Sequence, residues 1–268
     1  VACEKPTIQL LNTLEEKIDL LEKQQVDNLV IVPFTDAFSN LTAEEYISNF
    51  LVEKFHPHTI IIGHDHHFGK GRTGNYALLE EKSSIFHYTV KEIPAHMLLE
   101  VTISSTKIRQ SILNGDIEIA SKFLGYPYFF SGKVVKGNQL GRTIGYPTAN
   151  LQMEDEFKLI PGNGVYAVEL EKLEDRRLKI EDKSTQHSKL NSQHTIYKGM
   201  MNIGIRPTVD GTRKVIEVNI FDFDKDIYGE TLIITLKKYL RSEEKFNGIE
   251  ALKVQLARDK ENTLKALR

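Results

Sequence analysis

The first half of the chain alternates between apolar runs and stretches with helical periodicity. Capping-box spacings at Thr13–Glu16 and Thr42–Glu45 each precede apolar residues that recur at the helical period, which predicts two helices. Residues 28–34 and 59–63 are short apolar runs of the buried-strand type. A strand, a helix and a strand in this order predict a parallel βαβ unit and therefore an α/β domain.

The second half of the chain follows a different pattern. Residues 104–124 predict two short helices interrupted at Asn114–Gly115, and the segments beyond Gly125 alternate as strands do. The predicted strands cover residues 128–135, 164–170, 197–203, 215–221 and 231–240. The last stretch is helical, with Asn247 as its expected cap and Glu250 in its first turn. Several strands before one helix predict an all-β antiparallel barrel with a C-terminal helix.

This change of pattern divides the chain into two predicted domains, 1–124 and 125–268, with the boundary near residues 122–126. A charged stretch without aromatic residues, 172–191, interrupts the second domain. Such a composition cannot bury much apolar surface, so this stretch is predicted to be an exposed hairpin insertion.

Composition narrows the functional classes. The 268 residues are 40% apolar and 27% charged, with a formal net charge of -2. Because there is no basic surplus, we do not expect nucleic acid as a partner. The single cysteine, Cys3, excludes an intrachain disulfide and fits a reducing compartment. No apolar run approaches the roughly 20 residues of a membrane span, and no leader sequence is evident. We therefore expect a cytoplasmic protein without membrane partners. An oligomer is possible, but the sequence does not imply one.

Glycines and cations gather where the first predicted strand of the second domain ends. Gly132, Gly137 and Gly141 are interspersed with Lys133 and Arg142. Glycines let backbone amides approach an anion closely and cations add charge, so this region is a candidate polyphosphate site. The alternative is a glycine-rich hairpin with solvated lysines, since the spacing matches neither the Walker nor the dinucleotide pattern.

The run Pro147–Asn150 places a hydroxyl and a side-chain amide two residues apart. On an extended strand, Thr148 and Asn150 project to the same side. Oxygen ligands of this kind suit Mg²⁺ carried on nucleotide phosphates. The alternative is an edge strand that begins with proline, in which Asn150 merely satisfies a turn.

The predicted strand 215–221 has one apolar face and one polar face. Its isoleucine and valine residues alternate with Glu217 and Asn219. No histidine follows His194, so a carboxylate is the expected base if a hydroxyl group is deprotonated here. Glu217 is that candidate; the alternative is an ordinary glutamate on a solvated face.

Four stretches of the second half resemble riboflavin kinases, in the order in which that family has them. They are Gly132–Asn150 with its GRTIGYPTAN core, Gly164–Ala167, Asn202–Thr208 and Glu217–Gly229. The resemblance covers essentially all of 125–268. It implies a six-stranded antiparallel barrel that transfers the γ-phosphoryl group of ATP to the 5′-hydroxyl of riboflavin, which gives FMN.

The resemblance also implies roles for particular residues. In riboflavin kinases the threonine and asparagine of the PTAN motif hold Mg²⁺ and the phosphates of ATP, which assigns these roles to Thr148 and Asn150. The family's glutamate base corresponds to Glu217. Positioning and electrostatics would supply most of the catalysis, as phosphoryl transfer generally requires.

A later segment is similar to the part of these kinases that folds over the flavin. The matching residues are Arg241, Glu244 and Phe246. The alternative is a basic approach to the last helix with one core aromatic residue.

The helix start at residues 103–109 combines hydroxyl groups with two cations. Free amides and the helix dipole make such a place attractive to phosphate, and the alternative is a serine-capped surface helix. The run ISSTKIR is similar to the ISSTxIR motif of prokaryotic FMN adenylyltransferases, which precede riboflavin kinase in bifunctional FAD synthetases. This similarity implies a Rossmann-like nucleotidyltransferase domain with ATP-phosphate contacts from Ser104, Ser105, Thr106 and Arg109.

Residues 63–74 resemble a second signature of FMN adenylyltransferases, commonly GxDFxFGxxxxG. The resemblance implies that Asp65 and Phe68 shape the flavin or nucleotide pocket. The histidines around Asp65 suggest zinc as an alternative. Neighbouring side chains at a strand end point in different directions, however, and no further ligands follow at a zinc spacing.

Three aspartates at positions 222, 224 and 226 have the alternate spacing of a calcium loop. The sixth loop position holds Ile227 and the twelfth holds Ile233, where such a loop needs glycine and glutamate. We therefore predict a polar hairpin turn instead.

One element of the adenylyltransferase family has no counterpart. Its opening strand with an HxGH element is expected upstream, yet no His-x-Gly-His occurs in the sequence. We expect a bifunctional flavin-cofactor enzyme whose first domain is N-terminally incomplete in this chain. It would convert riboflavin and ATP to FMN and, in the complete protein, FMN and ATP to FAD. Two alternatives stay open: a riboflavin kinase with a non-functional first domain, and a non-catalytic flavin-binding regulatory module.

Overall fold

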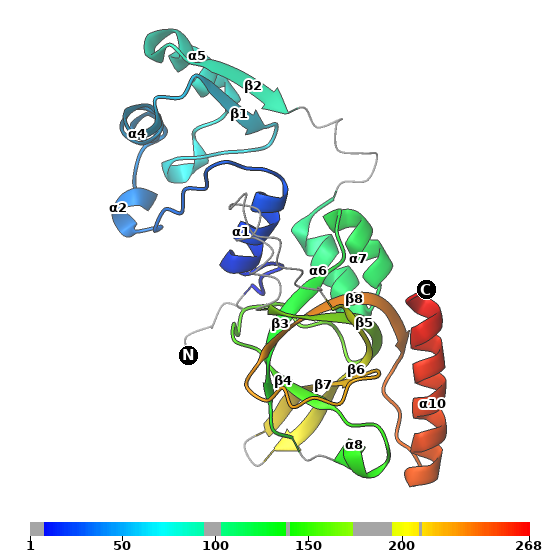
Figure 1. The fold of residues 1–268 in the computed structure, drawn as a ribbon. Helices are drawn as coiled ribbons and strands as arrows, with labels where there is room; N and C mark the ends of the chain where they lie inside the picture. The colour runs from blue at the N-terminus through cyan, green and yellow to red at the C-terminus, as the bar shows by residue number, and fades with distance from the viewer. Residues whose placement is uncertain (1–7, 94–102, 138–139, 174–194, 209–210) are drawn as a thin grey trace. The chain divides into compact units, whose positions relative to one another are not determined.

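The computed structural model divides the chain into two compact units. Unit 1 comprises Val1–Leu21 and Ser104–Arg268, and unit 2 comprises Glu22–Ile103. The structure describes residues 8–93, 103–137, 140–173, 195–208 and 211–268 (Figure 1). The predicted division between residues 124 and 125 stays a prediction, and most of the predicted insertion 172–191 lies outside the described residues. Among the described residues, no helix has both the length and the apolar character needed to span a bilayer.

Unit 2 contains a parallel βαβ unit. Strand β1 (Thr59–Gly63) pairs in register with β2 (Thr89–Ile93), and helix α5 (Tyr76–Phe86) connects them. The other elements of unit 2 are α2 (Asp36–Ser39), α3 (Ala43–Glu45), the π-helix η1 (Tyr46–Val52), α4 (Glu53–Phe55) and the 3₁₀ helix η2 (Lys70–Arg72). The predicted capping box at Thr42 and Glu45 is confirmed, because both of its hydrogen bonds are present.

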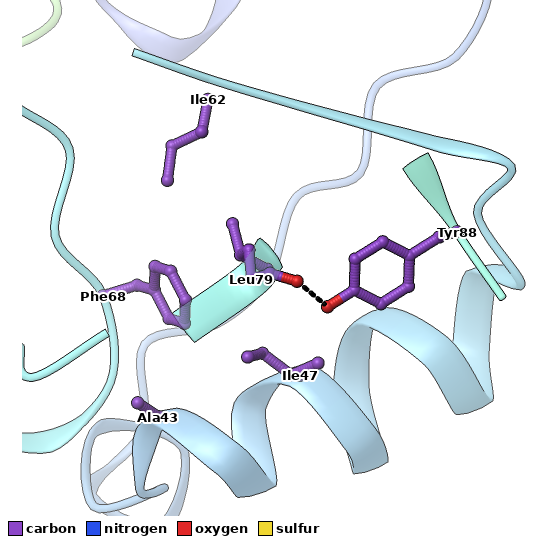
Figure 2. Close-up of a cluster of buried hydrophobic side chains, with 6 residues drawn as sticks. All are labelled: Ala43, Ile47, Ile62, Phe68, Leu79 and Tyr88. Carbon is purple, nitrogen blue, oxygen red and sulfur yellow. Dashed lines mark hydrogen bonds between the residues drawn. The ribbon is translucent and has the colours of Figure 1, made fainter. Parts of the chain in front are cut away.

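A small hydrophobic core holds unit 2 together. It consists of buried residues from α3, η1, β1, α5 and the loops beside them: Ala43, Ile47, Ile62, Phe68, Leu79 and Tyr88 (Figure 2). The Tyr88 hydroxyl is satisfied inside this core, since it donates to the Leu79 carbonyl at 2.9 Å. The core therefore joins the βαβ unit to the helices that precede it.

The prediction of a buried strand at residues 28–34 is wrong. These residues form neither helix nor strand, and Val30 and Ile31 are each 55% exposed while Phe34 is 80% exposed. A strand needs a neighbour to satisfy its backbone groups, and the described residues provide none for this run. The second strand of the sheet is instead β2, which carries Lys91 and Glu92 and therefore lacks the apolar pattern that predicts a buried strand.

Unit 1 is built around a closed antiparallel barrel, which confirms the predicted architecture. The strand order is β3-β4-β7-β6-β5-β8 (Figure 1). The strands are β3 (Phe129–Val135), β4 (Ala149–Gln152), β5 (Gly164–Lys172), β6 (Tyr197–Thr208), β7 (Gly211–Ile220) and β8 (Thr231–Arg241). Buried side chains that pack the barrel include Phe130, Val134, Tyr166, Val168, Met201, Ile203, Val218, Ile234 and Leu236.

The helices of unit 1 also follow the predicted order, with one corrected boundary. Helices α6 (Ser105–Asn114) and α7 (Ile117–Leu124) precede the barrel, α8 (Leu140–Thr143) follows β3, and α10 (Ile249–Ala266) packs against β5, β6 and β8. The predicted cap at Asn247 is wrong, because the N-cap residue is Gly248 with φ 104° and no side-chain hydrogen bond. Its positive φ explains why glycine occupies this position.

The connection between β7 and β8 differs from the predicted hairpin turn. These strands are not neighbours in the barrel, since β7 pairs with β4 and β6 whereas β8 pairs with β3 and β5. Residues 221–230 therefore form a crossover connection. Two of the three aspartates, Asp224 and Asp226, line a cavity described below together with Val134 of β3 and Ala149 of β4.

The N-terminal segment belongs to unit 1. The predicted capping box at the start of α1 (Leu14–Lys23) is confirmed, with Thr13 N donating to Glu16 Oε2 at 3.1 Å and Glu16 N to Thr13 Oγ1 at 3.2 Å. Glu16 also forms a buried ion pair with Lys158, whose side chain is 1% exposed. Burial lowers the pKa of Lys158 from its ordinary value, although the Glu16 carboxylate opposes this shift.

Candidate active site

A cavity of about 500 Å³, called here the first cavity, is lined by residues of the barrel strands and of helix α10. Its walls come from strands β6 and β7, the loop before β4, the segment after β8 and helix α10. The polar side chains that line it are Thr148, Asn202, Arg206, Glu217, Asn219, Arg241, Glu243, Glu244 and Asp259, and apolar ones include Met200, Met201, Phe246, Leu252 and Leu256. An apolar pocket with a few convergent polar groups is the usual form of a small-molecule site.

Strand register brings three polar residues together beside this cavity. Glu217 on β7 lies directly opposite Asn150 on β4 and opposite Asn202 on β6. Residues opposite one another in antiparallel strands present their side chains on the same face of the sheet. The barrel therefore collects a row of polar groups from positions that are far apart in the sequence.

Glu217 is partly buried and held by a cation. Its side chain is 20% exposed, and its Oε1 accepts a hydrogen bond from Arg206 Nη2 at 2.9 Å. Both residues line the first cavity. A half-buried carboxylate in such a pocket is able to accept a proton from a hydroxyl group of a bound molecule, since it lies within reach of the cavity.

The loop between β3 and β4 is shaped by close approaches to two glycines. A Cβ atom at Gly137 would collide with Asn150 Nδ2, and one at Gly141 would collide with the Tyr146 carbonyl oxygen. The same hypothetical Cβ at Gly141 would lie 3.4 Å from Thr148 Oγ1. Both glycines thus let the backbone pass directly beside the two polar residues of the PTAN run.

Asn219 fixes the start of β4 from the opposite strand. It is buried, and its Nδ2 donates to the Pro147 carbonyl at 2.7 Å. This hydrogen bond holds the backbone immediately before Thr148. The position of the Thr148 hydroxyl therefore depends on the packing of β4 against β7.

A second cavity, of about 640 Å³, adjoins the same loop. Thr148 lines both cavities. The second cavity is further lined by Val134, Arg142, Pro147, Ala149, Val218, Ile220 and residues 223–228. Two molecules bound in the two cavities would meet at Thr148, with Glu217 on the side of the first cavity.

The predicted flavin segment forms the rim of the first cavity. Arg241, Glu244 and Phe246 all line it, and the Arg241 guanidinium lies 5.7 Å from the centroid of the Phe246 ring. Arg241 also pairs with Asp259, with Nη2 2.7 Å from Oδ2. These hydrogen bonds to the Asp259 carboxylate raise the pKa of Arg241 above its ordinary value.

The residues predicted to bind phosphate in the glycine-rich region lie in different parts of unit 1. Gly132 is inside β3 and faces Leu151, and the exposed Lys133 follows it on the same strand. Neither residue belongs to the lining of the two cavities. Gly141 lines the first cavity and Arg142 the second, so the glycine-rich region contributes to both of them. Their phosphate-binding roles stay predictions.

The adenylyltransferase candidates are divided between the two units. Ser104 is the N-cap of α6 and accepts a hydrogen bond from Lys107 N at 3.3 Å, with Ser105 and Thr106 exposed in the first turn. Arg109 Nε donates to the Gln9 carbonyl at 2.7 Å within unit 1. The predicted helix start is confirmed, and the contacts of these residues with ATP stay predictions.

Asp65 and Phe68 belong to unit 2. Asp65 is exposed in the turn after β1, whereas Phe68 is a member of the hydrophobic core (Figure 2). The centroid of the Phe68 ring lies 5.2 Å from that of the Tyr46 ring. Phe68 thus has a packing role, and its predicted role in shaping a flavin or nucleotide pocket stays a prediction. His64, beside Asp65, pairs with Glu92 at 3.0 Å, and no group of three or more potential metal-ligating side chains occurs in the described part of the chain.

Known proteins match both halves of the chain. The riboflavin kinase family matches residues 124–267, and the FAD synthetase family matches residues 1–107. The bifunctional riboflavin kinase/FMN adenylyltransferase of Haemophilus influenzae is 37% identical over 94% of this chain and 75% of its own length. This chain belongs to the bifunctional riboflavin kinase/FMN adenylyltransferase family.

Other relatives extend the match. The bifunctional riboflavin kinase/FMN adenylyltransferase of Escherichia coli is 35% identical over 93% of the chain and 73% of its own length. A crystal structure from Streptococcus pneumoniae, described as a macrolide-efflux protein, is 34% identical with a TM-score of 0.77, and covers 94% of this chain and 75% of that one. The chain therefore spans about three quarters of the length of the relatives that it matches.

Several residues of the first cavity escaped the sequence-based selection. Arg206, Asn202 and Asn219 lie in the motifs or strands already noted, but their contacts depend on the neighbour of each strand. Asp259 had a local signal, since it follows Leu252 and Leu256 on one face of an amphipathic helix. A charged residue in an apolar stripe is unusual and indicates a buried partner.

Proposed function

We propose that the barrel phosphorylates riboflavin, with riboflavin in the first cavity and ATP in the second. Riboflavin would give FMN and ATP would give ADP. The observation that carries this proposal is Thr148, which lines both cavities beside Glu217. Phosphoryl transfer requires the two substrates to meet at one point with a group that handles the acceptor's proton.

Glu217 is the proposed base. It would accept the proton of the riboflavin 5′-hydroxyl as that oxygen attacks the γ-phosphorus and the bond to the leaving ADP oxygen breaks. Arg206, 2.9 Å from Glu217 Oε1, would orient the carboxylate so that its other oxygen faces the cavity. The guanidinium also brings positive charge toward the transferring group, where negative charge has to be stabilised.

The residues around Thr148 fit a magnesium ion carried by ATP. Thr148 offers a hydroxyl oxygen and Asn150 an amide oxygen, which are the hard ligands that Mg²⁺ prefers. The Asn150 amide packs against the Gly137 backbone, and Glu217 stands opposite it in the neighbouring strand. Bound there, the ion would neutralise charge on the phosphates. We propose that Thr148 and Asn150 bind the magnesium ion and that Gly141 and Arg142 contact the phosphates of ATP.

We further propose that the FAD synthetase part of the chain adenylylates FMN with ATP to give FAD. Ser104, Ser105, Thr106 and Arg109 would contact the ATP phosphates, and Asp65 and Phe68 would shape the pocket. The start of helix α6 at Ser104 supports this role. The first backbone N–H groups of a helix have no acceptor within the helix, and they therefore attract anions. A cytoplasmic location and the absence of nucleic-acid and membrane partners stay predictions.

Incubation of the chain with riboflavin, ATP and Mg²⁺, followed by separation of the flavins, tests both proposals. Formation of FMN supports the kinase, and FMN together with FAD supports both activities in this chain. Riboflavin binding without any product would contradict the kinase proposal and favour the flavin-binding module.

A further inference from the structure

The C-terminal helix supplies one wall of the first cavity. Leu252, Leu256 and Asp259 of α10 all line it, because their spacing places them on one face of the helix. The Asp259 side chain is only 2% exposed. A carboxylate buried beside two leucines requires a partner for its charge.

Asp259 is held by two other side chains. Arg241 forms a fork with it, with Nε 2.9 Å from Oδ1 and Nη2 2.7 Å from Oδ2. Gln255, one turn earlier on α10, donates to Oδ1 at 2.9 Å. A buried ion pair adds little net stability to the fold, because the loss of hydration of both charges offsets their attraction. Two parallel hydrogen bonds to a carboxylate do, however, fix the plane of a guanidinium group. The arrangement is therefore suited to orienting Arg241.

Arg241 in turn organises the rim of the cavity. It is the last residue of β8, and its Nη1 donates to the Ser242 carbonyl at 2.9 Å where the chain leaves the barrel. Its guanidinium also lies 5.7 Å from the centroid of the Phe246 ring, within the range of a cation–π contact. The rim is anchored on its other side, where Asn202 Nδ2 donates to Glu243 Oε1 at 3.3 Å.

We propose that Asp259 is a positioning residue for the flavin, a role that rests on the proposed kinase function. Through the Arg241 guanidinium it fixes Phe246 as the aromatic wall against which the tricyclic ring of riboflavin packs. Asp259 acts on the rim and does not contact the reacting atoms. Its loss should therefore weaken riboflavin binding equally in the ground state and in the transition state.

Asp259→Asn tests this role, because asparagine keeps the shape and removes the charge. We expect KM for riboflavin to rise about tenfold, the worth of a well-placed aromatic contact, with kcat within about twofold of wild type. KM for ATP should not change. The dissociation constant of riboflavin, measured without ATP by quenching of its fluorescence, should rise by the same factor as KM.

Two further variants keep the test decisive. Gln255→Ala removes one hydrogen bond to Asp259 and should raise KM for riboflavin by about two- to threefold. If circular dichroism shows that the Asp259→Asn protein is unfolded, the test uses Gln255→Ala in its place. Glu169→Gln breaks the barrel pair with Lys237, 2.8 Å apart and outside both cavities, and should leave every parameter unchanged.

The outcomes separate the two proposals. An unchanged riboflavin KM and dissociation constant in a folded Asp259→Asn protein would overturn the positioning role, as would an equal rise of KM for ATP. A wild-type protein that makes no FMN would refute the kinase function, and the riboflavin dissociation constants would still report on Asp259.

Discussion

The barrel of unit 1 and the sheet of unit 2 differ in how many neighbours each strand has. Every barrel strand pairs on both sides, because the sheet closes on itself. In the described part of unit 2, β1 and β2 have only each other. Open edges leave backbone groups unpaired, and apolar side chains such as Ile61, which is 64% exposed, remain uncovered.

This difference explains why motif residues converge in one region and not in the other. In the barrel, Asn150, Asn202 and Glu217 face the same side because three neighbouring strands are in register. In unit 2, Asp65 lies in an exposed turn and Phe68 in the core. A catalytic geometry depends on rigid elements that hold each side chain from several directions, and the closed barrel supplies them.

The largest effect is expected from Glu217→Gln in the barrel. Removal of the proposed base should lower kcat for FMN formation by about 10²–10⁴-fold while riboflavin and ATP still bind. Single-turnover assays with titrations of both substrates measure this, with Glu169→Gln as the matched carboxamide control. A turnover like that of wild type would exclude Glu217 as the base.

The next effect concerns the junction between the N-terminal segment and the barrel. Lys158→Met leaves the buried Glu16 without its cation and should lower the free energy of unfolding of unit 1 by about 3–5 kcal/mol. Urea unfolding followed by circular dichroism measures the loss. Replacing both partners, Glu16→Leu with Lys158→Met, should recover most of it, and a double variant as unstable as the single one would contradict this account.

A cavity in the core of unit 2 tests whether the two units respond separately. Ile47→Ala should destabilise unit 2 by about 2–5 kcal/mol, because Ile47 is fully buried in its small core. Hydrogen exchange followed by mass spectrometry should show faster exchange in residues 59–93 and unchanged exchange in the barrel strands. Kinase activity should persist. Equal loss of protection in both units would argue that they unfold together.

The smallest effect is expected at the proposed magnesium site. Asn150→Ala should raise the Mg²⁺ concentration needed for half-maximal FMN formation by about 10–100-fold, as loss of a supporting ligand commonly does. The matched control is Asn262→Ala on the far part of α10, which lines neither active-site cavity. An unaltered magnesium titration would remove Asn150 from the proposed metal site.

Much of the architecture was accessible from local patterns. The two capping boxes, the break at Asn114–Gly115 and the alternation on β7 each depend on residues a few positions apart. The prediction of a cap at Asn247 and that of a hairpin turn at Asp222–Asp226 were wrong, because backbone φ at Gly248 and the neighbour of β7 are not local sequence properties. The buried-strand prediction at residues 28–34 failed for the same reason, since pairing requires a distant partner.

The sequence by itself determined the antiparallel barrel and its final helix, because strand alternation and helical periodicity are local properties of the chain. It also selected Thr148, Asn150 and Glu217 as candidates, and their roles stay predictions. Only the tertiary structure decided that Arg206 donates a hydrogen bond to Glu217, that Thr148 lines two cavities and that Arg241 donates to Asp259. These contacts join strands and a helix that are separated along the chain. They exist only because strand closure and helix packing bring the side chains within hydrogen-bond distance.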